Sequence, residues 1–209
     1  MPKGDDLTKR GGIPPTPDCG MLLIISGPSG VGKTTISHAV VEALGGVLSV
    51  SITTRPMTET DIDGIDYHFV DQRTFDRYRH NGLLLEWAEV FGHCYGTVRD
   101  SVKEGLADSK LVILEIDVQG AIKVKQEMPD CYAFFILPPD EKTLLSRLRG
   151  RRRDGESEIQ GRFSKAKLEI ARARSSDVYD HFVINDDLKE AIDQSILWVR
   201  EQLGTQGSR

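Results

Sequence analysis

Residues 27–34 read Gly27-Pro28-Ser29-Gly30-Val31-Gly32-Lys33-Thr34. The stretch fits the pattern G-x-x-x-x-G-K-[ST], and it lies directly between the apolar run 22–26 and the helical pattern 35–44. Its glycines let the backbone turn N–H groups inward around phosphate oxygens, and the N-terminus of the following helix adds a partial positive charge. The sequence therefore predicts a strand, a nucleotide-binding loop and a helix in succession.

Two side chains of this loop carry the expected chemistry. The lysine of such a loop reaches the β- and γ-phosphates, and the hydroxyl that follows it binds Mg²⁺. We therefore predict Lys33 as a catalytic residue and Thr34 as the metal ligand. The predicted nucleotide-binding residues are Gly27, Pro28, Ser29, Gly30, Val31, Gly32, Lys33, Thr34 and Thr35.

The rest of the chain alternates between short apolar runs and helical patterns. Apolar runs separated by helices indicate buried strands of a parallel sheet, so we predict an α/β fold of three layers around a central parallel sheet. The predicted strands are residues 22–26, 111–117, 132–137 and 181–184, and the predicted helices are residues 35–44, 138–150 and 188–203.

Residues 47–97 interrupt this alternation. Strand-like stretches follow one another there at 47–52, 67–70, 83–90 and 95–97, beside one helical pattern at 71–80. We expect a mixed, mostly antiparallel insert at about residues 47–97, beside a core made of residues 21–46 and 98–209. Residues 1–20 are rich in glycine, proline and charge, which predicts a flexible leader.

Composition excludes several classes of protein. The chain of 209 residues has 39% hydrophobic and 28% charged positions, enough for one core but few for two domains. Neither a membrane span of roughly 18 apolar residues nor a secretory signal is found in the sequence. The net charge of −5 argues against a nucleic-acid partner, and three scattered cysteines suit a reducing cytoplasm.

Further segments resemble the guanylate kinase family, in the family's order. They are residues 49–55 (SVSITTR), 86–97 (EWAEVFGHCYGT), 114–120 (LEIDVQG) and 183–187 (VINDD), and the resemblance covers nearly all of residues 22–203. It implies transfer of the γ-phosphoryl group of ATP to GMP, and to dGMP, in purine nucleotide metabolism. It also implies Mg²⁺, a GMP-binding insert, and small-molecule substrates rather than a membrane or nucleic acid, and it leaves the oligomeric state open.

The expected base site follows from the hydrogen-bonding edge of guanine. Guanine offers N1–H and N2–H₂ donors beside an O6 acceptor, so a carboxylate next to a hydroxyl recognises it. By resemblance, Glu86 accepts from N1 and N2, while Ser51 and Thr97 donate towards O6.

The resemblance also assigns an acceptor-phosphate site. Arg55, Tyr67 and Tyr95 occupy the family's phosphate-holding positions, where an arginine fork fits phosphate oxygens. The family usually carries a second arginine three residues after the first, and here Thr58 stands in its place. Since a charge-assisted contact contributes about 1.5–3 kcal/mol, we expect weaker GMP binding unless another basic residue compensates.

Arginines cluster at residues 147–153 of this acidic protein. We predict an arginine-rich lid at about residues 148–160 that closes over ATP. By resemblance, Arg147, Arg151 and Arg162 are catalytic and surround the transferring phosphoryl group, where charge develops. A solvated basic helix end is the alternative interpretation.

Glu115 and Asp117 alternate at the end of the predicted strand 111–117, so both side chains point to one face. The carboxyl edge of a parallel sheet meets the ligand crevice, and we assign the pair to Mg²⁺-bound water and the guanylate end of the site. By resemblance Asn185 contacts adenine, whereas a loop-forming asparagine is the rival interpretation.

Two other functions stay open. A guanylate-kinase-like interaction module without catalysis would hold phosphorylated peptides, and a related kinase would phosphorylate another acceptor such as ribose bisphosphate. The intact loop 27–34 argues against the module, and Glu86 with Ser51 argues against the other acceptor.

Overall fold

The computed structural model describes residues 20–90, 92–150 and 155–206, so the predicted leader lies outside the described residues apart from Gly20. Within these ranges the centre is a five-stranded sheet in the order β2-β7-β1-β8-β9, with every neighbouring pair parallel. The predicted parallel sheet is therefore confirmed. Its strands are β1 (Met21–Ser26), β2 (Val47–Leu48), β7 (Leu111–Glu115), β8 (Tyr132–Leu137) and β9 (His181–Ile184).

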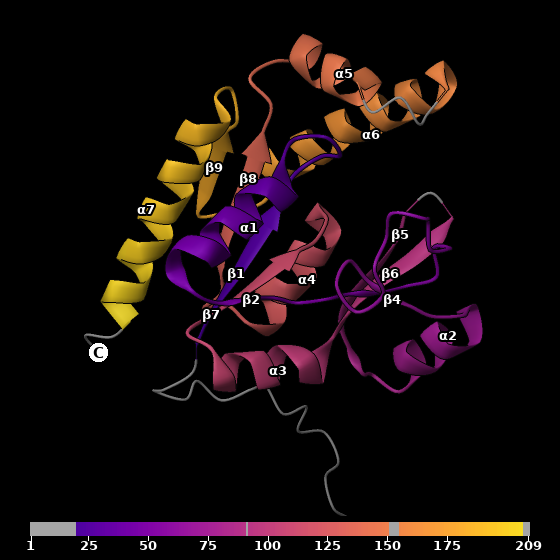
Figure 1. Cartoon of the computed structure of the whole chain (residues 1–209), viewed down its shortest axis with the longest axis vertical. Coiled ribbons are helices and arrows are strands. Elements are labelled where there is room, and N and C mark those ends of the chain that lie inside the picture. Colours follow the sequence, from indigo (N-terminus) through magenta and orange to yellow (C-terminus); the bar gives the residue numbers. More distant parts are fainter. Residues whose placement is uncertain (1–19, 91, 151–154, 207–209) are drawn as a thin grey trace, which may run out of the picture.

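Helices cover both faces of this sheet (Figure 1), namely α1 (Lys33–Leu44), α3 (Arg99–Asp108), α4 (Val118–Glu127) and α7 (Leu188–Gln206). Alternate side chains of β1 reach opposite layers. Leu23 and Ile25 belong to the core that includes α1 and α7, whereas Leu22 and Ile24 belong to the core that includes α3 and α4. Because a strand buried on both faces needs apolar residues at every position, β1 has no polar alternation until Ser26.

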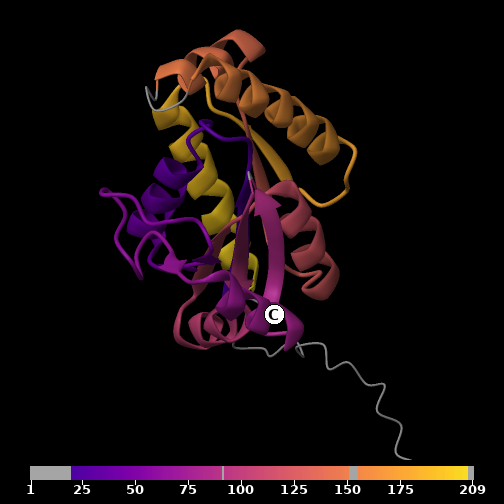
Figure 2. The same ribbon diagram turned by 90° about the vertical axis from the view of Figure 1, so that its right-hand side faces the viewer.

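A second sheet lies beside the first (Figure 2) and has its own small core around Phe75. In the described part of the chain it has four strands in the order β4-β3-β6-β5, of which β3 and β4 are parallel and the other pairs antiparallel. This confirms the mixed sheet that the sequence predicts between the core segments. Its elements are β3 (Ile52–Thr53), β4 (His68–Phe69), α2 (Gln72–His80), β5 (Leu84–Val90) and β6 (His93–Val98).

The predicted strand at residues 47–52 is wrong as a single element. Val47 and Leu48 pair with β7 in the central sheet, and the Ser49 N–H still donates to the Ile113 carbonyl oxygen at 2.9 Å. The chain then crosses to the second sheet, where Ile52 pairs with β6. The first half of the stretch pairs with the edge of β7, so one apolar run contributes a strand to each of the two sheets.

Two helices form a hairpin over the carboxyl end of the central sheet (Figure 1), namely α5 (Glu141–Gly150) and α6 (Glu156–Arg174). Leu144 and Leu148 of α5 pack with Ile159 and Ala166 of α6. The helices predicted from the sequence do not include α3, α4 or α6. No helix among the described residues combines the length and apolar character needed to cross a membrane.

Candidate functional site

The predicted nucleotide-binding loop joins β1 to α1 at the carboxyl end of the central sheet. Gly30 and Gly32 have φ angles of 82° and 99°, which residues with a side chain rarely adopt. A Cβ at Gly27 would lie 2.6 Å from the carbonyl oxygen of Ile136, and one at Gly32 would lie 2.6 Å from Nδ2 of Asn185. Glycine at these positions therefore lets the loop pack closely on β8 and on the residue after β9.

Both chemically active side chains of the loop have partners. The Lys33 ammonium donates to the carbonyl oxygens of Gly27 and Pro28, at 2.6 and 3.1 Å, so it arches over the loop. The Thr34 hydroxyl donates to Oε2 of Glu115 at 2.9 Å. The loop is thus tied to the end of β7, where oxygen ligands for a hard cation gather.

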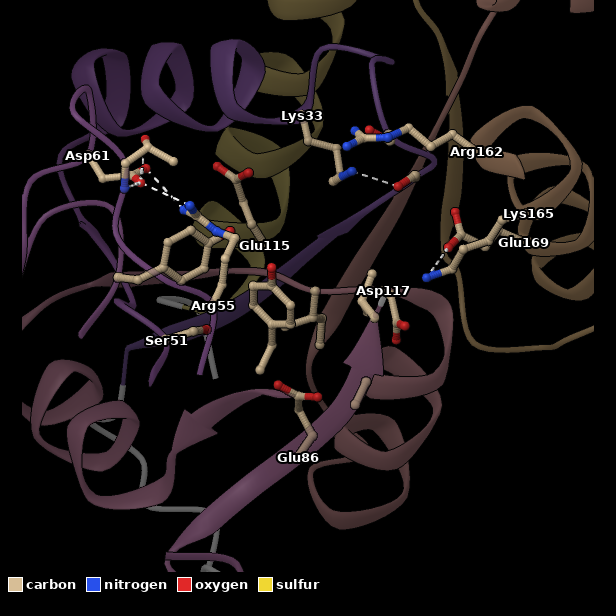
Figure 3. Close-up of a pocket in the computed structure, with 18 residues that line it drawn as sticks. Lys33, Ser51, Arg55, Asp61, Glu86, Glu115, Asp117, Arg162, Lys165 and Glu169 are labelled. Atoms are coloured by element: carbon tan, nitrogen blue, oxygen red, sulfur yellow. Dashed lines mark hydrogen bonds and ion pairs between the residues drawn. The ribbon is translucent and has the colours of Figure 1, made fainter. Parts of the chain in front are cut away.

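A cavity of about 800 Å³ lies between the two sheets and beneath α6 (Figure 3). Lys33 and Arg162 lie at one end of it and Glu86 at the other, with Glu115 and Asp117 between them. The predicted site residues that line it are Gly27, Ser29, Lys33, Ser51, Arg55, Tyr67, Glu86, Tyr95, Glu115, Asp117 and Arg162. Residues far apart in the sequence are therefore brought to one space.

A smaller hollow of about 250 Å³ lies on the other side of the loop. Its walls include the predicted residues Gly30, Val31, Gly32, Thr35, Arg147 and Asn185. Asn185 is 3% exposed, and its Nδ2 donates to the Val31 carbonyl oxygen at 2.8 Å. Its Oδ1 is buried without a hydrogen-bond partner in the described part of the chain. Asn185 therefore fixes the loop and still offers one acceptor.

Glu86 is a buried carboxylate, only 5% exposed, on β5. Burial raises its pKa to about 7, and this is opposed by the hydrogen bond that Thr97 donates to its Oε1 at 2.7 Å. Thr97 is itself buried, so its hydroxyl holds the Glu86 carboxylate in position through this hydrogen bond. Ser51, the other predicted guanine contact, also lines the cavity.

Arg55 lies among aromatic rings at the edge of the same cavity. Its guanidinium carbon is 5.4 Å from the centre of the Tyr67 ring, and Tyr67 meets Tyr95 edge to face with 5.6 Å between ring centres. Burial raises the pKa of Tyr67, which keeps its phenol protonated as a donor. Arg55, Tyr67 and Tyr95 thus form one cluster of polar side chains in the wall of the cavity.

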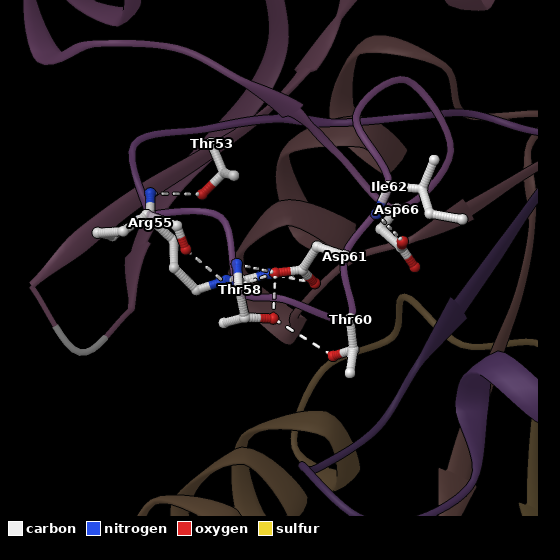
Figure 4. A network of polar contacts seen from close by, with 8 residues as sticks. Thr53, Arg55, Thr58, Thr60, Asp61, Ile62 and Asp66 are labelled. Carbon is white, nitrogen blue, oxygen red and sulfur yellow. Dashed lines mark hydrogen bonds and ion pairs between the residues drawn. The ribbon is translucent and has the colours of Figure 1, made fainter.

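Asp61 holds the fork of Arg55 (Figure 4), with contacts of 2.9 and 3.0 Å from the two terminal nitrogens. Thr58 in turn donates its N–H and its hydroxyl to Oδ2 of Asp61, both at 2.7 Å. Arg55 and Thr58 hold the pKa of Asp61 well below its usual range. Thr58 stands where the family usually has a second arginine. It thus stabilises the ion pair between Asp61 and Arg55.

Two cavity residues of α6 were not predicted. Lys165 and Glu169 follow Arg162 on one helical face, and the Lys165 nitrogen lies 3.6 Å from Oε1 of Glu169. Burial raises the pKa of Glu169. Of the predicted arginine trio, Arg162 lines the large cavity, Arg147 lines the smaller hollow, and Arg151 lies outside the described residues.

Comparison with known proteins identifies the family of the chain. The pattern of the family described as "Guanylate kinase" matches residues 20–199. The guanylate kinase of Rhizobium etli is 43% identical over 182 residues, covering 85% of this chain and 81% of that protein. That of Anaeromyxobacter dehalogenans is 44% identical over 185 residues, covering 88% and 81%. The crystal structure of guanylate kinase from Anaplasma phagocytophilum superposes with a TM-score of 0.72 at 32% identity, covering 89% and 87%. The chain therefore belongs to the guanylate kinase family.

Proposed function

We propose that this protein transfers the γ-phosphoryl group of ATP to GMP, giving ADP and GDP. The observation that carries the proposal is one cavity with a phosphate-binding loop at one end and a buried carboxylate at the other. Lys33 and Arg162 suit the phosphates of a donor nucleotide, while Arg55 and Glu86 suit the phosphate and base of an acceptor. Both substrates thus meet between the two sheets.

Glu86 and Ser51 select guanine in this proposal. Ionised Glu86 accepts from N1–H and N2–H₂, and Ser51 donates to O6. Adenine lacks N1–H and presents a donor at position 6, so its entry would leave buried polar groups unpaired. Sites of this kind reject the wrong analogue by about 10⁴-fold. None of the assigned contacts goes to the ribose 2′-hydroxyl, so we propose that dGMP is also an acceptor.

The transfer step needs positioning more than proton abstraction. The attacking atom is a GMP phosphate oxygen, which is already anionic near neutral pH, so no strong general base is required. Arg55, Tyr67 and Tyr95 hold that phosphate in line with the γ-phosphoryl group, and Lys33 and Arg162 stabilise the charge that develops.

The oxygen donors at the end of β7 fit Mg²⁺. The Thr34 hydroxyl lies 2.9 Å from the Glu115 carboxylate, and Asp117 lines the same cavity. Hydroxyl, carboxylate and water oxygens are the ligands that Mg²⁺ prefers. Thr34 would hold the ion while Glu115 and Asp117 order its water, and the bound ion would neutralise charge on the β- and γ-phosphates.

The division of labour along the chain is also part of the proposal. Residues 47–97 hold GMP, and a lid at about residues 148–160 closes over ATP and brings Arg147 and Arg151 to the phosphoryl group. We further infer a cytoplasmic location. Cys94 and Cys131 are buried free thiols, which suits a reducing compartment.

A coupled assay of ADP release tests this function. ATP and Mg²⁺ are supplied with GMP, dGMP, AMP, CMP, UMP or a sugar phosphate as separate acceptors. We expect turnover with the guanine nucleotides alone, and loss of at least about 100-fold in kcat for Lys33→Met. Lys103→Met, on the exposed face of α3, is the matched control.

Other outcomes distinguish the alternatives. Consumption of the sugar phosphate without GMP turnover would remove Glu86 from base recognition. If no acceptor gives ADP release although ATP binds, the protein would be a binding module without catalysis.

A further inference from the structure

The space occupied by the Glu86 carboxylate is bounded by α4. Gly120 is the third residue of this helix, and a Cβ built on it would lie 2.6 Å from Oε2 of Glu86 and 3.0 Å from its Cδ. A Cβ atom does not come this close to a non-bonded atom, so any side chain at position 120 displaces the carboxylate. Glycine here is required by a side chain on another element, because α4 itself would favour alanine.

The backbone of Gly120 is held in place from both directions. Asp117 caps the helix, and its Oδ1 accepts from the N–H groups of Gln119 and Gly120, both at 2.9 Å. Ala121 and Val124 of the same helix are fully buried against the central sheet. The helix is therefore fixed at this end, and the carboxylate has to yield when position 120 gains a methyl group.

One turn later, Lys123 fixes the strand that carries Glu86. Its ammonium donates to the Trp87 carbonyl oxygen at 2.6 Å and lies 4.8 Å from the centre of the Trp87 ring. Arg79 lies 5.1 Å from the same ring. Lys123 thus binds the backbone of the residue that directly follows Glu86, and its positive charge opposes the rise in the pKa of Glu86.

We propose that Gly120 and Lys123 of α4 are positioning residues for guanine recognition, the first by leaving room for the Glu86 carboxylate and the second by fixing the strand that carries it. The inference rests on the proposed function. The groups that face Glu86 are Thr97 from β6 and Asp117 and Lys123 from α4. Of these Lys123 supplies the positive charge, so its removal should leave Glu86 harder to ionise.

Gly120→Ala tests the steric part. The readout is kcat/KM for GMP and for IMP, which keeps N1–H and O6 but lacks the 2-amino group. We expect the GMP value to fall by about tenfold or more and the GMP:IMP ratio to fall with it, because the displaced carboxylate no longer meets both donors. KM for ATP should not change. Gly204→Ala in α7, where an added Cβ meets nothing within 4 Å, is the matched control.

Lys123→Met tests the electrostatic part through the pH profile of kcat/KM for GMP. Guanine binding needs ionised Glu86, so kcat/KM for GMP falls at low pH and gives the profile an acid limb. Loss of the Lys123 ammonium should move the midpoint of this limb to higher pH by about half a unit or more. Lys123→Arg should restore the original limb. Lys125→Met is the control, since Lys125 also donates from α4 to a backbone carbonyl, that of Cys131 at 2.6 Å.

Two results would overturn the inference. One is an unchanged GMP:IMP ratio in folded Gly120→Ala. The other is an acid limb that Lys123→Met moves no more than Lys125→Met does. If Gly120→Ala does not fold, the Lys123 series decides alone. A parent protein without GMP turnover would instead contradict the proposed function, which keeps the two failures separate.

Discussion

In the proposed function, Glu86 serves guanine recognition, and burial of its charge costs stability. Burial raises its pKa from 4.5 to about 7, so the folded protein binds the proton more tightly than the unfolded chain. The stabilising contribution of the protonated form is complete below about pH 4.5 and is lost as pH rises through 7. Glu86→Gln should therefore raise the unfolding free energy at pH 8 by about 2 kcal/mol, roughly 5 °C in Tm, and change little at pH 4.5.

Thermal unfolding at the two pH values checks this expectation. The matched control is Glu89→Gln, an exposed position on the same strand, which should stay within about 0.5 kcal/mol of the parent. Equal gains in the two variants would mean that net charge, and not the burial of Glu86, is responsible. GMP turnover of Glu86→Gln should be lost under all conditions, because an amide cannot accept both guanine donors.

Thr58 is the second residue with a direct consequence for affinity. It lines the cavity, and its N–H and hydroxyl brace Asp61, which pairs with Arg55. Thr58→Arg keeps the N–H contact and adds a cation beside the acceptor phosphate. We expect KM for GMP to fall by about tenfold with little change in kcat or in KM for ATP.

Thr60→Arg provides the comparison for Thr58→Arg. Thr60 belongs to the same exposed loop, 3.3 Å from the Thr58 hydroxyl, but is absent from the described walls of the cavity. A general attraction of GMP to added positive charge would lower KM equally in both variants and would disappear in salt. Such a result would contradict a direct contact at position 58.

At the scale of elements, Asn185 connects the end of β9 to the nucleotide-binding loop. Its Nδ2 bonds the Val31 carbonyl oxygen, and the absence of a side chain at Gly32 makes room for it. Asn185→Ala leaves that buried carbonyl unsatisfied and loosens the loop. We expect KM for the donor nucleotide to rise by about tenfold while KM for GMP is unchanged.

The choice of donor separates the two interpretations of Asn185. If it fixes the loop, Asn185→Ala raises KM by the same factor for ATP, GTP and CTP, since the loop binds phosphates common to all three. A rise confined to ATP would mean that its contact with adenine dominates. Steady-state kinetics at saturating GMP gives the three values.

How well the sequence predicts an element depends on how local its cause is. β1 and β8 are apolar at nearly every position because helices bury both faces, and such runs are visible directly. α4 was missed because Asp117, which ends the predicted strand, is also the N-cap of the helix. The division of residues 47–52 between two sheets depends on the free edge of β7, which no local pattern contains.

The same distinction holds within the site. The loop residues were predicted from spacing alone, since their chemistry lies in one contiguous stretch. Lys165 and Glu169 were missed because the helix containing them was not identified, although their spacing from Arg162 is that of one helical face. Asp61 was missed because its importance comes from a bidentate contact with Arg55 across a loop.

At the scale of the whole molecule, the large cavity has walls from three parts of the fold. The second sheet supplies Glu86, the loop after β1 supplies Lys33, and α6 supplies Arg162. In the proposed function, GMP contacts the second sheet and ATP contacts the loop after β1. In that proposal only the two nucleotides together span the cavity. Each nucleotide alone should therefore stabilise a different region of the molecule.

Hydrogen exchange of backbone amides measures this separation. GMP alone should slow exchange in residues 51–69 and 84–97, whereas a non-hydrolysable ATP analogue with Mg²⁺ should slow it in residues 27–35 and 185–188. Protection of residues 162–169 should need both ligands, because α6 borders the space between them. AMP alone, which lacks the N1–H assigned to Glu86 in the proposed function, should leave residues 84–97 unprotected. Protection of α6 by GMP alone would mean that the acceptor, and not the pair of nucleotides, draws this helix over the site.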